Sequence, residues 1–291
     1  MEPPVIIEAA INGGTPKRRN PNVPRSDDEI VADALACIEA GAAIVHHHLS
    51  ITGLSGPDAA EAYLRIWRPV LTERPDALLY PTFNFRADGS HDHAHLDPLA
   101  ASGLARVGLC DPGSVNLGRW RDGVPAGSFV YVNDLDTVAD QLATCARNGL
   151  GPAIAIYEPG YLRIVLAWHA AGRLPPGAMV KFYFCDDRGA FGGAPFGLRP
   201  TRRALDAYLE LLSDSDIPWA VSVVGGDVGR SDIAVDALER GGHLHLGLEF
   251  FDGDRQPTNV ELVHEAVELC ASVGRSVATP AEAAAILGLA R

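Results

Sequence analysis

The sequence predicts a (β/α)8 barrel, also called a TIM barrel, formed by a single domain that spans residues 1–291. Short apolar segments, typical of buried parallel strands, alternate along the chain with segments typical of helices. About eight such units follow one another, which is the number that closes this fold. The chain has no change in composition, no long linker and no internal repeat that would favour another architecture.

The expected elements follow from hydrophobic patterning and from residues that start or stop helices. Barrel strands are predicted at residues 5–11, 42–45, 77–84, 104–110, 153–157, 179–184, 219–224 and 243–249, with a short additional strand at 128–132. Helices are predicted at residues 26–40, 57–74, 134–148, 161–171, 202–212, 231–240, 260–273 and 279–287. Ser26 and Glu29 form a capping-box pattern at the start of the first helix.

The charge and cysteine content restrict the class of protein. Lys and Arg total 24 and Asp and Glu total 37, so the formal net charge is −13, which argues against nucleic acid or an anionic membrane as the main partner. The five cysteines are scattered without a CxxC pair, as is typical of reduced thiols. No signal peptide is recognisable, and no apolar run approaches the roughly 18 residues of a membrane span. We therefore expect a cytoplasmic protein.

Three consecutive histidines close the second predicted strand. Side chains alternate across a strand, so His46 and His48 share one face while His47 points to the other. Two imidazoles at this spacing can offer two ligands to one metal ion, most commonly zinc. The alternative is a set of buried histidines bonded to the backbone. The position of the pair at a strand end favours the metal site.

The eighth predicted strand supplies a third ligand. Its leucines occupy one face, which should meet the helices, so His245 and Glu249 should face the barrel interior. Strands two and eight both flank strand one, and barrel active sites form at the carboxyl ends of the strands. Glu249 can therefore join His46 and His48 there, although a surface carboxylate is the alternative. Two histidines, one carboxylate and an open position form a catalytic zinc site.

Four motifs extend this interpretation: AAIxGG at residues 9–14, PxxPRSDDEIVADALACIEAGAAIVHHHLS at 21–50, IYEPG at 156–160 and GGHLHLGLE at 241–249. Together they resemble the β-keto acid cleavage enzymes, of which the 3-keto-5-aminohexanoate cleavage enzyme is the best-known type. The resemblance covers nearly the whole chain. It implies a zinc-dependent barrel, usually a homo-oligomer such as a dimer or tetramer. This barrel would condense a β-keto acid with acetyl-CoA to give acetoacetate and a new acyl-CoA.

The resemblance also implies residue roles. The family's zinc ligands match His46, His48 and Glu249, and zinc would act as a Lewis acid on the keto acid and stabilise an enolate. The family's proton-abstracting arginine and aspartate are replaced by His245 and Phe250.

Three groups are candidates for the missing base: His245, Asp252, and His93 or another histidine of the run at residues 91–95. For that run, exposed histidines without a catalytic role are the alternative. Residues that could hold substrate oxygens lie in the loops after strands three and four: Thr82, Asn84, Gly113, Ser114 and Asn116. Glu158 could orient a ligand or a water, or could simply accept hydrogen bonds from neighbouring N–H groups.

Two other functions are open at this point. A zinc-dependent hydrolase or aldolase that does not use CoA would explain the loss of the family's proton-abstracting pair. A degenerate metal-binding barrel without catalysis is the second alternative, which the complete set of three ligands disfavours.

Overall fold

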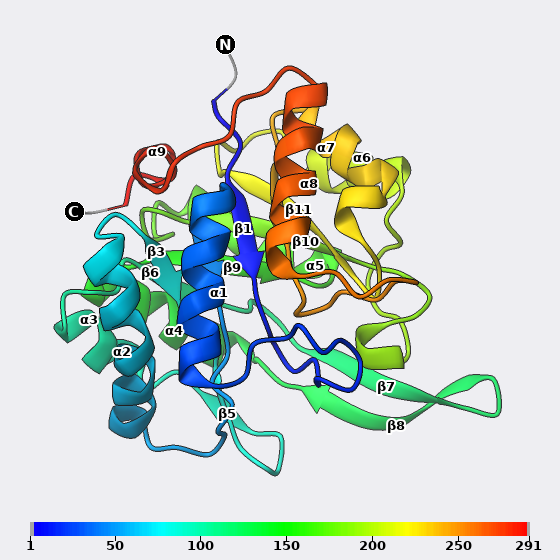
Figure 1. Ribbon diagram of the computed structural model, residues 1–291. Coiled ribbons are helices and arrows are strands. Elements are labelled where there is room, and N and C mark those ends of the chain that lie inside the picture. The colour runs from blue at the N-terminus through cyan, green and yellow to red at the C-terminus, as the bar shows by residue number, and fades with distance from the viewer. Residues whose placement is uncertain (1–2, 290–291) are drawn as a thin grey trace.

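The computed structural model describes residues 3–289 and confirms the predicted TIM barrel. Eight parallel strands are hydrogen-bonded in the order β3-β2-β1-β12-β11-β10-β9-β6. The two end strands, β3 and β6, lie next to each other, so the sheet forms a nearly closed barrel with helices around it (Figure 1). The strands are β1 (Ile7–Ala10), β2 (Ile44–His46), β3 (Leu78–Tyr80), β6 (Val107–Cys110), β9 (Gly151–Ile156), β10 (Met179–Cys185), β11 (Trp219–Val224) and β12 (His243–Leu246).

The helices lie near their predicted positions. They are α1 (Asp27–Ala40), α2 (Gly56–Glu73), α3 (Leu96–Ala101), α4 (Leu135–Asn148), α5 (Pro159–Ala170), α6 (Arg202–Leu212), α7 (Asp232–Leu238), α8 (Asn259–Ser272) and α9 (Pro280–Leu287), with 3-10 turns η1 (Ala190–Gly192) and η2 (Val228–Arg230). The predicted capping box of α1 is confirmed, because the Ser26 and Glu29 side chains each accept a hydrogen bond from the other residue's backbone N–H. The short helix α3 was not predicted from the sequence.

Apolar residues fill the space between the strands and helices and cover the amino ends of the strands. Leu244 and Leu246 of β12 lie in the main apolar cluster with Leu262 of α8, so the predicted direction of the leucines is confirmed. At the amino ends of the strands, Leu287 of α9 packs with Ile6 and other strand residues, and α9 covers this end. The carboxyl ends of the strands, where TIM-barrel sites form, lie at the opposite end.

The eighth strand is shorter than expected. It was predicted to reach residue 249, but β12 ends at Leu246. Gly247 has φ +134°, and a Cβ placed on it would lie 2.2 Å from the carbonyl oxygen of Ala10, so the chain can turn closely past β1 only with glycine. The turn moves Glu249 off the strand.

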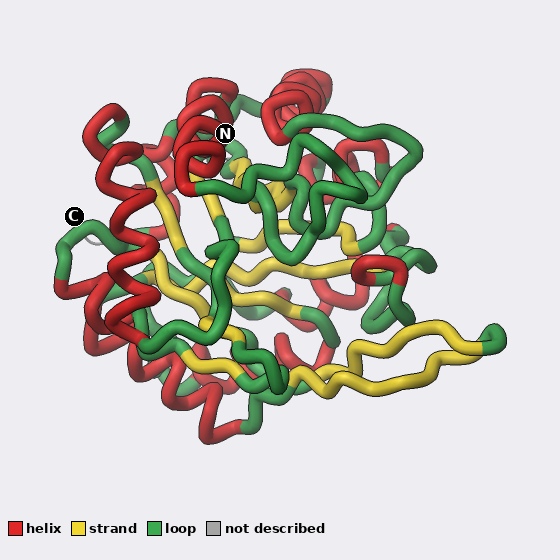
Figure 2. Tube along the Cα trace, turned by 60° about the horizontal axis from the view of Figure 1, so that its bottom comes forward, coloured by secondary structure: helices red, strands yellow, loops and turns green. Residues whose placement is uncertain are grey.

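A projecting hairpin is the main departure from the predicted elements. β7 (Val115–Arg121) and β8 (Val124–Tyr131) pair antiparallel and extend away from the barrel (Figures 1 and 2). Only a short strand at 128–132 was predicted. The hairpin turns at Asp122 and Gly123, which have φ values of 50° and 80°. An Asp-Gly pair is a strong hairpin signal, because both residues tolerate positive φ.

The third strand also differs from the prediction. β3 ends at Tyr80, directly before Pro81, which has no N–H to offer a sheet ladder. The chain then forms a small antiparallel pair, β4 (Asn84–Phe85) with β5 (His91–Asp92). Part of the histidine run at residues 91–95 therefore lies in this pair and not in an open loop.

Among the helices of residues 3–289, none is both long and apolar enough to cross a membrane. The assignment of residues 1–291 to one domain stays a prediction, and its first two and last two residues lie outside the described part of the chain.

His47 contributes to the packing of the helical shell. Its ring points away from the barrel interior, as predicted, and its Nε2 accepts a hydrogen bond of 2.9 Å from Nε1 of the buried Trp67 on α2. We expect His47→Ala to lower the free energy of unfolding by about 2–4 kcal/mol, because it leaves a cavity and an unpaired buried N–H. Urea denaturation measures this change. A loss below about 0.5 kcal/mol, which is within the range of ordinary surface substitutions, would contradict the expectation.

Candidate active site

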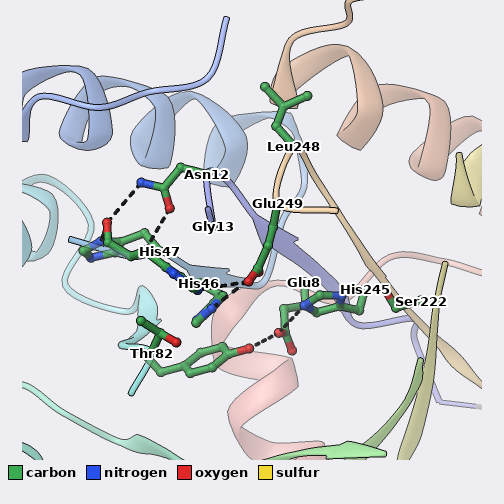
Figure 3. A network of polar contacts seen from close by, with 12 residues as sticks. Glu8, Asn12, Gly13, His46, His47, Thr82, Ser222, His245, Leu248 and Glu249 are labelled. Carbon is green, nitrogen blue, oxygen red and sulfur yellow. Dashed lines mark hydrogen bonds and ion pairs between the residues drawn. The ribbon is translucent and has the colours of Figure 1, made fainter. Parts of the chain in front are cut away.

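His46, His48 and Glu249 converge at the carboxyl end of the barrel. β1 lies between β2, which carries His46, and β12, which precedes Glu249. His46 Nε2 lies 3.5 Å from Glu249 Oε2, and His48 Nε2 lies 2.9 Å from Glu249 Oε1. One donor atom from each of the three residues falls within 4.8 Å of the others, and Glu249 points towards His46 in Figure 3. This triad could hold one metal ion.

Side chains, and not a sheet ladder, fix the backbone of His48. The Asn12 side chain donates to the carbonyl oxygen of His48 over 3.0 Å and accepts from its N–H over 2.8 Å. Asn12 is fully buried directly after β1 (Figure 3). It therefore acts on His48 as the neighbouring peptide group of a strand would.

A similar arrangement holds Glu249. Its N–H donates to the carbonyl oxygen of Ala10 over 3.1 Å, and its own carbonyl oxygen accepts from the Thr15 hydroxyl. The N–H of Leu248 donates to Asn259 Oδ1 over 2.9 Å, while Asn259 Nδ2 donates to the carbonyl oxygen of Ile11 over 2.8 Å. These contacts attach the segment with Glu249 to β1 and to the first residue of α8.

Burial and charge set the protonation states in the triad. Burial lowers the pKa of His46 to about 3, so its imidazole is neutral at physiological pH. Burial alone would raise the pKa of Glu249, but the neighbouring His48 and His46 outweigh it and lower this pKa to about 2. A neutral imidazole and an ionised carboxylate are the forms that bind a cation.

A buried charged cluster lies below the triad. Glu8 of β1 contacts Lys181 of β10 at 3.0 Å and His245 of β12 at 3.1 Å, and it accepts a hydrogen bond from the Tyr80 hydroxyl. The Tyr80 ring stacks on His46 with a centroid distance of 4.4 Å. Burial would raise the pKa of Glu8, but Lys181 and His245 hold it well below its usual range. The cluster thus keeps a carboxylate ionised in the barrel interior.

His245 faces the barrel interior, as predicted, and its ring is enclosed on both sides. Nδ1 lies 3.0 Å from Ser222 Oγ, and Nε2 lies 3.3 Å from the Tyr183 hydroxyl as well as beside Glu8 (Figure 3). A cavity of about 20 Å³ is lined by residues that include His245 and Glu249. That volume suffices for one water molecule.

A third carboxylate, Asp111, lies directly after β6 at the same end of the barrel. It is 8% exposed, and its Oδ2 accepts a hydrogen bond of 2.8 Å from the hydroxyl of Tyr131. Its backbone N–H donates to Gln141 Oε1. Burial raises the pKa of Asp111 to about 6, and the charge of Glu249 also raises it, while Lys181 and His48 lower it.

The other two predicted proton acceptors have partners elsewhere. Asp252 lies 3.5 Å from Arg19 and 3.8 Å from Arg188. His93 Nε2 lies 3.2 Å from Asp140 Oδ2 and 3.1 Å from Thr144 Oγ1, both on α4. Each of these contacts is with groups outside the triad.

The six predicted substrate-binding residues lie at separate places in the structure. Thr82 lies on the same side as His46 in Figure 3, and its N–H donates to the hydroxyl of Tyr63. Asn84 Nδ2 donates to the carbonyl oxygen of Leu54. The remaining four are placed as follows: the Gly113 carbonyl and the Ser114 hydroxyl both bond to Asn133, Asn116 is exposed on β7, and Glu158 accepts from the N–H of Gly197 over 3.0 Å.

Three residues of the site were not predicted from the sequence: Glu8, Lys181 and Asp111. The signal was present for two of them, because Glu8 and Lys181 are the charged residues inside otherwise apolar strand segments. A charged residue in a buried strand needs a partner, and each supplies the other. Asp111 follows its strand directly, which is a frequent position for functional groups in this fold.

Comparisons with known proteins agree with this architecture. A family model for the beta-keto acid cleavage enzyme matches residues 4–289. The chain is 27% identical over 292 residues to a 3-keto-5-aminohexanoate cleavage enzyme of Acetoanaerobium sticklandii, covering 99% of each chain. It is also 27% identical over 300 residues to a 3-oxoadipate:acetyl-CoA acetyltransferase of Cupriavidus necator, covering 99% of this chain and 96% of that one. A 3-dehydrocarnitine:acetyl-CoA trimethylamine transferase of Rhizobium meliloti is 22% identical, with coverage of 97% and 95%.

Solved structures support the fold alone. ObcA in its apo form has a TM-score of 0.68 at 17% identity, covering 92% of this chain and 66% of that one. Its binary complex with oxaloacetate has a TM-score of 0.69 at the same identity, covering 93% and 68%. The resemblance inferred from the four sequence motifs is confirmed by the family model, which covers nearly the whole sequence. The chain belongs to the beta-keto acid cleavage enzyme family.

Proposed function

We propose that the chain is a zinc-dependent β-keto acid cleavage enzyme that condenses a β-keto acid with acetyl-CoA to give acetoacetate and an acyl-CoA. The observation that carries this proposal is the convergence of His46, His48 and Glu249 in a barrel of this family. The acetyl-CoA part is supported by the relatives from Cupriavidus necator and Rhizobium meliloti, whose names include acetyl-CoA.

The chemistry of the triad fits a zinc ion. Two imidazole nitrogens and one carboxylate oxygen are a common donor set of catalytic zinc, with a fourth position left for substrate. Glu249 Oε2 is buried and has no hydrogen-bond partner, although it lies 3.5 Å from His46 Nε2. A cation bound between the three side chains would satisfy this oxygen.

The chain's own residues share the remaining tasks in this proposal. When bound, zinc supplies Lewis acidity towards the keto and carboxylate oxygens of the substrate. Thr82, Asn84, Asn116 and the N–H group of Ser114 hold substrate oxygens, whereas the predicted Gly113 N–H already donates to the carbonyl oxygen of Asp111 over 2.9 Å. Glu158 accepts a hydrogen bond from the N–H of Gly197 and orients a ligand or a water.

The sequence offers three candidates for proton transfer: His245, Asp252 and His93. His245 is supported by its place beside Glu8 and by the cavity of about 20 Å³, which has room for a relaying water. We also propose a cytoplasmic homo-oligomer, dimer or tetramer. All five cysteines are buried and unpaired, which is compatible with a reducing compartment.

The metal assignment predicts about one zinc per chain. His48→Ala should abolish stoichiometric zinc binding and turnover while leaving cooperative unfolding, because His48 is a partly exposed ligand and does not pack in the core. The measurement is metal analysis by mass spectrometry together with circular dichroism. His47→Ala is the matched control, because this neighbour points away from the triad and should retain zinc. Full zinc occupancy in the His46→Ala/His48→Ala double variant would rule out the assignment.

A substitution at Gly13 should also affect zinc binding. It has φ +48°, and a Cβ placed on it would lie 2.2 Å from Glu249 Cγ, so any larger residue must displace the Glu249 side chain. We expect Gly13→Ala to weaken zinc binding roughly 10- to 100-fold, the range seen when groups that orient a ligand are altered. Competition with a chelator measures the affinity. Gly14→Ala is the control, and equal affinities of both variants and the wild type would contradict the prediction.

The reaction is tested with a panel of β-keto acids, with and without acetyl-CoA, using protein of known zinc content. We expect formation of acetoacetate and of a new acyl-CoA, followed by mass spectrometry, only when acetyl-CoA is present. Consumption of the keto acid without acetyl-CoA would instead identify a hydrolase or aldolase. No consumption of any keto acid in the zinc-loaded protein would contradict the proposed function.

A further inference from the structure

The family resemblance implies that Phe250 replaces a proton-accepting aspartate, and the Phe250 side chain has no group that can take up a proton. The three carboxylates that are buried within residues 3–289 are Glu8, Glu249 and Asp111. Glu249 and Asp111 lie at the carboxyl ends of the strands and Glu8 lies below the triad, so all three are candidates to replace the missing base.

Two of the three carboxylates are committed to cations. Glu8 contacts both Lys181 and His245, and these neighbours keep it ionised. Glu249 lies within 3.5 Å of both triad histidines and is the proposed metal ligand. Neither can take up a proton without losing these contacts.

Asp111 is in a different situation. The one hydrogen bond to its carboxylate comes from a neutral hydroxyl, that of Tyr131, and no cationic side chain contacts it within the described residues. Asp111 follows β6 at the carboxyl end of the barrel, the end at which the triad lies, and the charges of His48 and Glu249 act on its pKa. It can gain or release a proton there without breaking an ion pair.

We propose that Asp111 is the general base that takes the proton from the carbon between the keto and carboxylate groups of the substrate. This proposal rests on the proposed function. The C–H bond breaks, its electron pair is delocalised onto the keto and carboxylate oxygens, and the proton passes to a carboxylate oxygen of Asp111. The carbanion attacks the thioester carbonyl and releases the CoA thiolate, which then attacks the original keto carbon.

The final step returns the proton. The carbon–carbon bond breaks, its electron pair stays on the carbon that becomes the methylene of acetoacetate, and Asp111 protonates this carbon. The carboxylate is thus restored after each turnover, and no external proton donor is required.

The environment of Asp111 suits this task. Burial raises its pKa to about 6, near the operating pH, where a general base is most effective. The titratable and polar groups that face it from the surrounding elements are Tyr131 of β8, Gln141 of α4, Tyr157 after β9, Tyr161 of α5, Lys181 of β10, His48 and Glu249. Among these, the hydrogen bond from Tyr131 lowers the pKa of Asp111.

The experiment follows two readouts in zinc-loaded protein: exchange of the substrate C–H in D₂O without acetyl-CoA, by NMR, and kcat against pH with acetyl-CoA. Asp111→Asn should lower both rates at least about 100-fold, the lower end of what acid–base catalysis contributes. Asp111→Glu should restore part of the loss. Tyr131→Phe should keep the base but move the acidic limb of kcat to higher pH. The hydrogen bond from Tyr131 lowers the pKa of Asp111, so its removal should raise that pKa.

Asp214→Asn, which removes an exposed carboxylate between α6 and β11, is the matched control. Zinc content and unfolding of each variant identify losses that come from misfolding, and Tyr131→Phe tests the proposal if Asp111→Asn does not fold. The role of Asp111 would be overturned if Asp111→Asn exchanged the substrate C–H at the wild-type rate, or if the acidic limb of kcat did not move in Tyr131→Phe. Turnover by the wild-type protein would still uphold the proposed function in that case. The wild type could instead catalyse C–H exchange but no turnover with acetyl-CoA. If Asp111→Asn then abolished the exchange, the result would support Asp111 as the base and would contradict acetyl-CoA as the co-substrate. Absence of both in the wild type would overturn both.

Discussion

The reciprocal hydrogen bonds between Asn12 and the backbone of His48 are the interaction on which the site depends. β2 ends at His46, so no sheet ladder reaches His48. The Asn12 side chain offers one carbonyl and one NH₂ group, as a peptide would, and satisfies both backbone groups. Asn12 follows β1, and the carbonyl oxygen of Ala10 on β1 receives the N–H of Glu249. The imidazole and the carboxylate are therefore positioned through the same strand.

Glu249, on the other side of the triad, is positioned by the close approach of its segment to β1 and to Gly13. Gly247 and Gly13 both adopt positive φ, which lets the segment before Glu249 pass near β1 and lets its side chain cross Gly13. Asn259 then joins this segment to α8 through the N–H of Leu248. Glu249 thus lies outside the strand but is held by backbone contacts on two elements. Such support from rigid elements is what keeps ligands in place before a metal binds.

Local patterns in the sequence were sufficient for the barrel and for the directions of His46, His47 and His48, because side-chain alternation in a strand depends only on neighbouring residues. Glu249 was found through the adjacency of the first and last strands in a barrel. The partners of His245 could not be found in this way. They depend on the register of β1, β10 and β12, which places Glu8 opposite His245, and on a long-range contact with Lys181.

Other parts of the prediction failed for reasons that are also physical. β12 ends at Leu246 because Gly247 adopts φ +134° against the carbonyl oxygen of Ala10, a conformation outside the extended backbone of a strand. The β7–β8 hairpin was reduced to one strand, although Asp122-Gly123 is a hairpin signal, because an insertion of this kind does not belong to the repeating β/α pattern. The small pair β4–β5 was assigned to a loop, since two-residue strands carry no detectable periodicity.

The described part of the barrel holds three buried carboxylates, and their neighbours give them different affinities for protons. Glu8 has two cationic partners and Glu249 has two imidazoles, and in both cases these partners outweigh the effect of burial. Asp111 has a neutral phenol, and burial prevails. Identical functional groups in one barrel can therefore perform different tasks, because the surrounding residues determine which of them stays ionised and which can exchange a proton.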